Sequence, residues 1–423
     1  MAERSGEPNT NRGWLSSPAH RAWLLDQAQH LIGFYQYACP DPKGGFFELG
    51  ENGAPQSNPA RSLVVTARMV HNFSLAHLLG RPGAGPLADH GIRFLQEAYR
   101  DRTHGGYFWE VDHEGARDTS KQAYGHAFVL LAASSALMAQ RAGAAELLSD
   151  IWSALDTHFW SEADGLVVEE FKEDWTPLSP YRGQNCNMHL VEALLTAAEA
   201  THNPLYLQRA LRIAERLIRD LTAGNNWRLA EHYTAQWQID TEYNREDPEN
   251  MYRPFGSVIG HWPEWSRLLL QIHALSAAPP EWLLPAARRL FDAAMDEGWD
   301  QQAGGLAYTV DFDGKVLNTD HYQWPISEAI SAAARLIQVT ADPRYEHWYR
   351  TLWDYADGHI IDHARGGWYY VMDGQNRPKN IPGVVTGKPD LYHALQSCLV
   401  PLLPADAGIG ASLRDGKLER ILL

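Results

Sequence analysis

The stretch Asp101-Arg-Thr-His-Gly-Gly-Tyr-Phe108 decides the fold, because related stretches recur along the chain at nearly constant spacing. Three further copies begin at Asp41, Asp300 and Asp362, and a degenerate copy lies at 162–168. The last glycines of the five copies are Gly45, Gly106, Gly165, Gly305 and Gly367, so the steps between them are 61, 59, 140 and 62. A beat of about sixty residues is typical of an array of supersecondary units.

The long third step holds two periods if one copy has lost its glycines. Asn225-Asn226-Trp227-Arg228 stands one period after Gly165, where that copy is expected. The step that follows is longer than the others, and the polar stretch 240–253 is the candidate insertion. Six periods result.

Between the copies, apolar residues recur at helical spacing. We expect one set of helices at 67–79, 125–138, 188–199, 265–276 and 326–338, and partner helices at 206–221, 282–295 and 345–354. Each period then supplies two helices and a short aromatic β-hairpin at its Gly-Gly turn. An open solenoid needs polar capping repeats, and none is evident here. We therefore predict an all-α protein, an (α/α)6 barrel in which six helical hairpins close into a toroid.

We expect one catalytic domain over residues 1–423, with its core at about 14–405 and tails that need not be ordered.

The chain has 36 Lys and Arg against 52 Asp and Glu, a net charge of −16. That excess repels phosphate backbones and anionic lipid, so we expect neither a nucleic-acid nor a membrane partner. Three widely spaced cysteines form no disulfide or zinc pattern. Residues 1–13 lack the apolar segment of a secretory signal, so we expect a cytoplasmic location.

Aromatic residues are abundant, with 16 Trp, 18 Tyr and 12 Phe. They fit either a helical core or a carbohydrate site in which rings stack on sugar C–H groups. No phosphate-binding glycine loop, nucleotide fingerprint or Gly-x-Ser-x-Gly elbow occurs, so nothing in the sequence indicates nucleotide-dependent chemistry.

Three histidines stand at the starts of expected inner helices: His189, His261 and His393. In a closed barrel such helix ends meet at a central cavity, the default location of a site. The positive end of the helix dipole disfavours imidazolium, which leaves a neutral ring able to act as a general base. The alternative for each is a structural histidine whose ring nitrogens are hydrogen-bonded inside the barrel wall.

Two charged residues accompany these histidines. Glu264 follows His261 by three residues, so it could form a metal-binding pair, orient a histidine, hold a sugar hydroxyl, or simply favour the first helical turn. Arg68 interrupts an apolar helix, and a buried arginine needs either a structural ion pair or ligand oxygens.

Five segments in order along most of the chain resemble the N-acylglucosamine 2-epimerase superfamily, and within it the bacterial mannose isomerase and sulfoquinovose isomerase branch. They are Thr66-Ala-Arg-Met, Asn187-Met-His-Leu-Val-Glu-Ala, Gly260-His-Trp-Pro-Glu-Trp, Gln323-Trp-Pro-Ile-Ser-Glu-Ala and Pro389-Asp-Leu-Tyr-His. The resemblance covers about residues 14–405 and implies an (α/α)6 barrel with an isomerase activity that needs no metal and no cofactor.

The resemblance also implies roles for individual residues. His393 would remove the proton next to the carbonyl and return it through an enediolate, and His261, held by Glu264, would assist ring opening. The implied substrate-binding residues are Arg68, Asn185, His189, Glu264 and Trp324. Gln323, which stands where an arginine is common in the sulfosugar branch, and the negative net charge argue against a sulfonated substrate. We therefore expect interconversion of D-mannose and D-fructose, with D-lyxose and D-xylulose as smaller substrates.

Several alternatives stay open at this stage. The same histidines could epimerise C2 of mannose, glucose, an N-acylated hexosamine or cellobiose, and a sulfoquinovose isomerase ranks below that. A glycoside hydrolase or lyase needs a pair of carboxylates flanking the bond, and no pair is set as clearly as the histidines. A sugar-binding or protein-interaction scaffold is the alternative without catalysis. The expected partner is a monosaccharide, and the protein is either a monomer or a homodimer.

Overall fold

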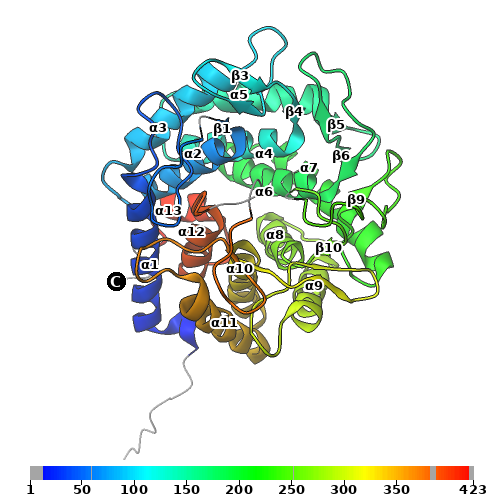
Figure 1. The fold of residues 1–423 in the computed structure, drawn as a ribbon. Helices are drawn as coiled ribbons and strands as arrows, with labels where there is room; N and C mark the ends of the chain where they lie inside the picture. The colour runs from blue at the N-terminus through cyan, green and yellow to red at the C-terminus, as the bar shows by residue number, and fades with distance from the viewer. Residues whose placement is uncertain (1–12, 59, 251, 382–386, 419–423) are drawn as a thin grey trace, which may run out of the picture.

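Six inner helices form a ring and six outer helices surround it in the computed structural model, which describes residues 13–58, 60–250, 252–381 and 387–418 (Figure 1). The inner helices are α2 (Leu63–Leu78), α4 (Ala123–Met138), α6 (Gln184–Thr201), α8 (His261–Leu275), α10 (Gln323–Thr340) and α12 (Tyr392–Leu399). The outer helices are α1 (Pro18–Gln36), α3 (Ala84–Phe94), α5 (Ala144–Ala154), α7 (Pro204–Ala214), α9 (Leu283–Gly298) and α11 (Pro343–Tyr355). The predicted (α/α)6 barrel is confirmed.

The two rings differ in how they bury their side chains. Inner helices are buried almost all round, as in α4, where nearly every residue from Ala123 to Met138 is inaccessible. Outer helices such as α7 bury one stripe and expose the other, the ordinary pattern of a surface helix. Four outer helices continue into a wider π-helical turn, at Leu95–Tyr99, Leu155–Phe159, Glu215–Thr222 and Ala356–Ile360.

Five of the six recurrent stretches form the expected hairpins. Antiparallel bridges join Pro40 to Phe46, Arg100 to Tyr107, Trp299 to Leu306 and Ile361 to Trp368, and β5 (Trp160–Ser161) pairs with β6 (Leu166–Val167). In the second copy, Asp101 Oδ1 accepts the N–H groups of Thr103 and His104, and Gly106 has φ +75°. A Cβ on Gly106 would also lie 2.7 Å from the Trp175 ring, which explains why glycine is needed there.

The fourth copy departs from this pattern. Residues Ala223–Asn225 form a 3-10 turn, and both Asn226 and Trp227 take a positive φ. No hairpin bridge joins its two sides within the described part of the chain. The insertion expected at 240–253 follows β9 (His232–Tyr233) as a loop of successive turns.

Short antiparallel pairings link each period to the next and close the ring. They join β1 (Arg61–Ser62) to β2 (Glu110–Val111), β4 (Lys121–Gln122) to β7 (Glu170–Phe171), β8 (Arg182–Gly183) to β9, β10 (Ser257–Val258) to β11 (Thr309–Val310), and β13 (His321–Tyr322) to β14 (Val371–Met372). β3 (Ala116–Asp118) and β12 (Val316–Asn318) extend two of these ladders. The sixth pairing, between Leu49 and Lys388, joins the last period to the first. Helix α1 packs against α12 at the same seam.

Buried ion pairs fasten three of the hairpins to the ladder. Arg61 binds Asp41 at 2.7 Å, Lys121 binds Asp101 at 2.7 Å, and Lys388 binds Asp362 at 2.8 Å. In each pair the cation stands in the segment before an inner helix, and the acid is the first residue of a recurrent stretch. These pairs account for the acidic start of three copies, whereas among the described residues Asp300 accepts only backbone N–H groups of its own turn through Oδ1.

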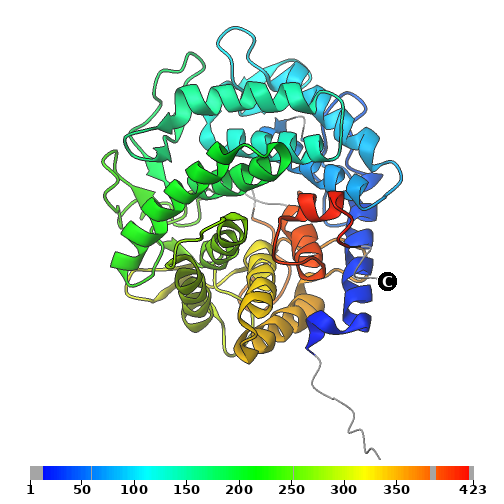
Figure 2. The same cartoon turned by 180° about the vertical axis from the view of Figure 1, so that it is seen from behind.

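The C-terminal segment closes the back of the barrel. Helix α13 (Ile409–Arg414) packs on α2, α4 and α6, as the view from behind shows (Figure 2). The expectation that the chain beyond residue 405 lies outside the ordered core is therefore wrong for residues 406–418, because α13 buries Ala411 and Leu413 against the inner ring. Residues 1–12 and 419–423 lie outside the described residues.

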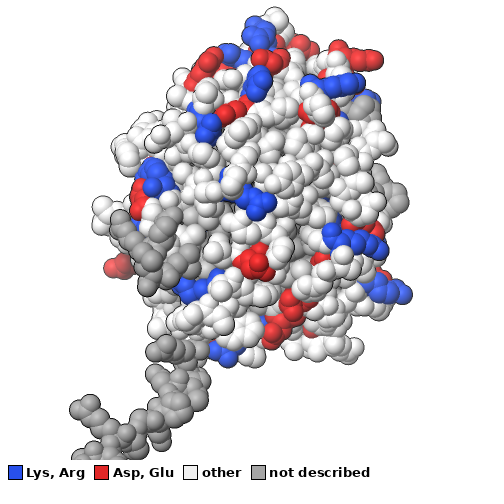
Figure 3. Space-filling model, turned by 90° about the vertical axis from the view of Figure 1, so that its left-hand side faces the viewer, with Lys and Arg blue, Asp and Glu red and all other residues white. Residues whose placement is uncertain are grey.

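The surface mixes both charge signs despite the net charge. On the face that carries α1, basic and acidic side chains are scattered in small groups among uncharged residues (Figure 3). Among the described helices, none is both long enough and apolar enough to cross a bilayer.

The buried ion pair between Lys388 and Asp362 yields a stability prediction. Replacing Lys388 with methionine removes the cation and leaves the Asp362 carboxylate buried without it, so the free energy of unfolding should fall by about 3 kcal/mol. Urea unfolding followed by tryptophan fluorescence measures this change. Lys417→Met is the matched control, because its partner Asp406 is largely exposed, and it should change stability by less than about 0.5 kcal/mol. Equal losses in the two variants would contradict the structural role given to the buried pair.

Candidate active site

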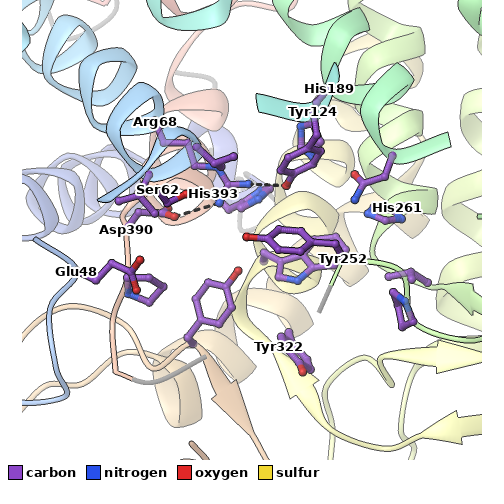
Figure 4. Close-up of a pocket in the computed structure, with 18 of the residues that line it drawn as sticks. Glu48, Ser62, Arg68, Tyr124, His189, Tyr252, His261, Tyr322, Asp390 and His393 are labelled. Atoms are coloured by element: carbon purple, nitrogen blue, oxygen red, sulfur yellow. Dashed lines mark hydrogen bonds and ion pairs between the residues drawn. The ribbon is translucent and has the colours of Figure 1, made fainter. Parts of the chain in front are cut away.

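A cavity of about 420 Å³ opens where the N-terminal ends of the six inner helices meet (Figure 4). Every inner helix contributes to its wall within its first two turns. The seven residues predicted from the sequence all line this cavity: Arg68, Asn185, His189, His261, Glu264, Trp324 and His393. The structure therefore brings together side chains from opposite ends of the sequence.

His393 is held by a buried carboxylate. Its Nδ1 lies 2.8 Å from Glu328 Oε1, and the other oxygen of Glu328 accepts a hydrogen bond from Arg267 Nε at 2.7 Å. Burial raises the pKa of Glu328, but the Arg267 charge and the His393 hydrogen bond outweigh it and bring the pKa below its usual value. An ionised Glu328 accepts the proton of Nδ1, so the ring is left with an unprotonated Nε2. Burial also lowers the pKa of His393, which keeps the ring neutral.

His261 is held by a different carboxylate from the one expected. Its Nδ1 lies 2.9 and 3.0 Å from the two oxygens of Glu231. Gln184 Nε2 donates to Glu231 Oε2 at 2.8 Å, and the Gln184 carbonyl accepts from Trp265 Nε1. The expectation that Glu264 orients His261 is wrong, because Glu231 is brought beside the ring by the pairing of β8 with β9.

Glu264 instead lines the cavity beside His189. Its Oε1 is 3.7 Å from His189 Nδ1, and neither of its buried oxygens has a hydrogen-bond partner in the described structure. Burial, together with the nearby charges of Glu328 and Glu192, raises the pKa of Glu264 well above its usual value. A neutral carboxyl group at this position can donate a hydrogen bond as well as accept one.

His189 is buried among aromatic rings. Its ring centroid lies 4.7 Å from that of Phe128, 5.1 Å from Tyr124 and 6.5 Å from His393. Burial lowers the pKa of His189 to about 4, against a partial upward effect of Glu192. The neutral ring expected from the helix dipole is thus found, but burial is the main cause.

Arg68 has the structural ion pair that was one of its two expected roles, and it lines the cavity as well. Its Nη1 donates to Asp390 Oδ2 at 3.0 Å and its Nη2 to the Tyr124 hydroxyl at 3.2 Å. The guanidinium stacks over the Phe128 and Tyr392 rings at 4.4 and 4.8 Å from their centroids. Arg68 is therefore ion-paired and also faces the cavity.

Trp324 and Asn185 complete the predicted set. The Trp324 ring lies beside both carboxylate-bound histidines, 5.0 Å from the His261 centroid and 5.7 Å from that of His393. Asn185 Oδ1 has no hydrogen-bond partner among the described residues. An apolar ring face beside unpaired polar atoms suits a polyhydroxylated ligand.

Tyrosine side chains form much of the outer wall: Tyr124, Tyr252, Tyr308, Tyr322 and Tyr370. Tyr252 comes from the inserted loop and makes edge contacts with Tyr124 and Trp109. The loop beginning at Asp240 thus supplies part of the cavity wall.

Sequence reasoning missed four residues that position the site: Glu231, Arg267, Glu328 and Asp390. Glu328 and Arg267 interrupt apolar inner helices in the same way as Arg68, so the sequence carries the same signal for them. Asp390 stands inside the segment of resemblance that begins at Pro389. Its partner Arg68, in another of these segments, was among the predicted residues. Glu231 precedes a two-residue strand and carries no comparable signal.

Two sets of buried side chains have the spacing of metal ligands. They are His189, Glu192 and Glu264, and a second set of Glu264, Glu328 and His393. Arg267 binds Glu328 at 2.7 Å and Glu192 at 3.2 Å, so a metal ion at either set would compete with a guanidinium already bound there.

Comparison with known proteins places the chain in a family. The profile of N-acylglucosamine 2-epimerase (GlcNAc 2-epimerase) matches residues 44–397. The chain belongs to the N-acylglucosamine 2-epimerase family.

Within this family, the chain is 43% identical over 402 residues to a D-mannose isomerase from Thermobifida fusca, with 95% of this chain and 98% of the relative covered. A crystal structure of a D-mannose isomerase superposes with a TM-score of 0.86 at 36% identity, covering 94% of this chain and 99% of that one. A cellobiose 2-epimerase from Spirochaeta thermophila DSM 6192 superposes with a TM-score of 0.81 at 25% identity, covering 97% and 100%.

The burial of His189 yields a titration prediction. Its NMR signals should shift with a midpoint near pH 4, because the folded protein resists charging this ring. In the unfolded chain, a histidine binds this proton near pH 6.5. The contribution of His189 to the free energy of unfolding should therefore fall by up to about 1.4 kcal/mol per pH unit as the pH falls from about 6.5 to about 4. The His189→Asn variant assigns the signal. A midpoint between pH 6 and 7 would contradict the buried, neutral ring.

Proposed function

We propose that this protein is an aldose–ketose isomerase that interconverts D-mannose and D-fructose by proton transfer, without a metal ion. The observation that carries the proposal is the His393–Glu328–Arg267 array, which presents an unprotonated imidazole nitrogen at a sugar-sized cavity. The similarity to D-mannose isomerases over nearly the whole chain supports the choice of sugar.

His393 acts on carbon. Nε2 removes the proton from C2 of the open-chain aldose, and the C2–H electron pair forms a C1–C2 double bond while the carbonyl oxygen takes up negative charge. The same nitrogen then delivers the proton to C1, and the electrons at O2 form the ketone. One base suffices for both steps because C1 and C2 are adjacent.

His261 and Glu231 act on oxygen. Glu231 accepts from Nδ1, so the opposite nitrogen of His261 is free to accept a proton from a sugar hydroxyl and return it. Such a group opens the hemiacetal ring and moves the proton between O1 and O2. Trp324, whose ring lies beside both histidines, would form a surface on which the sugar rests.

The negative charge of the enediolate needs donors already in place. Arg68 is fixed by Asp390, Tyr124 and two aromatic rings, so it loses little freedom when it meets that charge. Asn185 and His189 hold hydroxyl groups. Glu264, with its raised pKa, donates a hydrogen bond to a substrate oxygen.

Proton NMR of the purified, chelator-treated protein with D-mannose in D2O tests the proposal. We expect D-fructose that carries some solvent deuterium at C1. D-Glucose without fructose would contradict isomerisation and indicate a 2-epimerase that uses the same histidines. Loss of activity on chelation, restored by a metal, would contradict the metal-independent step.

Glu328→Gln tests the array at His393. The carbonyl of the introduced amide would accept from Arg267 Nε, which turns the amide NH2 toward His393 Nδ1. That nitrogen then becomes an acceptor, the proton moves to Nε2, and the base is lost. We expect kcat for mannose to fall by about 100-fold or more, with the fold retained. The control is Glu199→Gln. Glu199 is also a buried carboxyl group, but it lies near the C-terminal end of α6, away from the cavity, so this variant should keep kcat within about threefold. Wild-type kcat in Glu328→Gln would overturn the role of His393.

A further inference from the structure

The repeat places a glutamate at the same ladder position in each of the first three periods. Glu48, Glu110 and Glu170 immediately precede the residues that pair with Lys388, Arg61 and Lys121. In the other three periods this position is taken by His232, Thr309 and Val371. The three glutamates are therefore equivalent by position, and their surroundings can be compared directly.

Two of the three glutamates have a cation of their own. Glu170 binds Arg253 at 2.7 Å and the Ser179 hydroxyl at 2.6 Å. Glu110 lies 3.5 Å from Arg117 Nε. The carboxyl group of Glu48 makes neither a hydrogen bond nor an ion pair with any described residue, although it lines the cavity.

The charges around Glu48 are mostly of its own sign. It stands beside Asp390 on the same side of the cavity (Figure 4) because the Leu49–Lys388 bridge brings their two segments together. Burial and the charges of Asp390 and Glu110 raise its pKa, and Arg61 offsets this only in part. Arg61 is itself bound to Asp41 at 2.7 Å.

Among the described residues, no further lysine or arginine balances the charge on this side of the cavity. Arg68 is the one lysine or arginine among the described residues that line it, and Asp390 already binds Arg68 at 3.0 Å. A ligand group that enters beside Glu48 therefore meets an excess of negative charge in a partly buried site, where screening by water is weak.

We propose that Glu48 selects for uncharged sugars by repelling those that carry a phosphate, sulfonate or carboxylate group. This inference rests on the proposed function and specifies its substrate class. Neutral hydroxyl groups can donate to the Glu48 carboxylate, whereas an anion must either approach it unpaired or force it to take up a proton. Binding sites commonly reject a charged analogue of their ligand by means of an unpaired charge of the same sign.

The test is a selectivity ratio: kcat/KM for D-mannose divided by kcat/KM for D-mannose 6-phosphate. The inhibition constant of the phosphate against mannose serves where its turnover is too slow to measure. The wild type should strongly prefer mannose. Glu48→Gln, which keeps the shape and removes the charge, should lower the ratio about tenfold, and Glu48→Lys should lower it further.

Two matched variants remove one negative charge elsewhere. Glu114→Gln lies on an exposed hairpin outside the cavity and should leave the ratio unchanged. Glu110→Gln should lower the ratio less than Glu48→Gln, because Arg117 already offsets Glu110.

Three results would overturn the inference while the proposed function stands: equal use of both sugars by the wild type, an unchanged ratio in Glu48→Gln, or an equal fall in Glu114→Gln. Failure of the wild type to convert D-mannose would overturn the proposed function and this inference with it.

Discussion

The network of charges in the active site depends on one buried guanidinium. Arg267, only 5% exposed, binds Glu328 on α10 and Glu192 on α6 from its own position on α8. Two carboxylates can remain ionised in this interior because they share that cation. Glu264 lies 3.9 Å from the same guanidinium and makes no hydrogen bond to it, so it is the carboxyl group whose pKa rises. Arg267 therefore determines which of these three glutamates are ionised: the two that it binds, and not Glu264.

Closure of the barrel gives this network its geometry. The six ladder pairings hold the N-terminal ends of the inner helices around one cavity, and the pairing of Leu49 with Lys388 completes the circle. Side chains from the first two turns of all six helices then converge on the cavity, and loops supply only part of its wall. A site built on packed helices is held more rigidly than one built on loops, as the proposed proton transfer between fixed atoms requires.

The repeat made most of the fold predictable from the sequence. A Gly-Gly turn at a beat of about sixty residues implies paired helices, and an array without capping repeats implies closure. The starts of the inner helices were less predictable: α2 begins at Leu63 and α6 at Gln184, four residues before the expected starts. Neither has a side-chain cap, because a ladder strand precedes each helix and sets its first residue. The signal normally read from capping residues is therefore absent.

The site was predictable where polar residues interrupt apolar helices, as Arg68, His189 and His393 do. It was not predictable where a partner comes from a loop, because Glu231 reaches His261 only through the pairing of two-residue strands. Short strands of this kind carry too few residues for an alternating pattern. The correction from Glu264 to Glu231 follows from that pairing.

In the proposed mechanism, His393 removes the proton from C2 of the sugar. D-Mannose labelled with deuterium at C2 tests it directly, by following loss of the label into H2O with the wild type, His393→Asn and His261→Asn. We expect the wild type to release deuterium and to show a primary isotope effect, whereas His393→Asn releases none and His261→Asn, which keeps the base at carbon, still releases some. Release of C2 deuterium by His393→Asn at the wild-type rate would contradict the proposed role of His393.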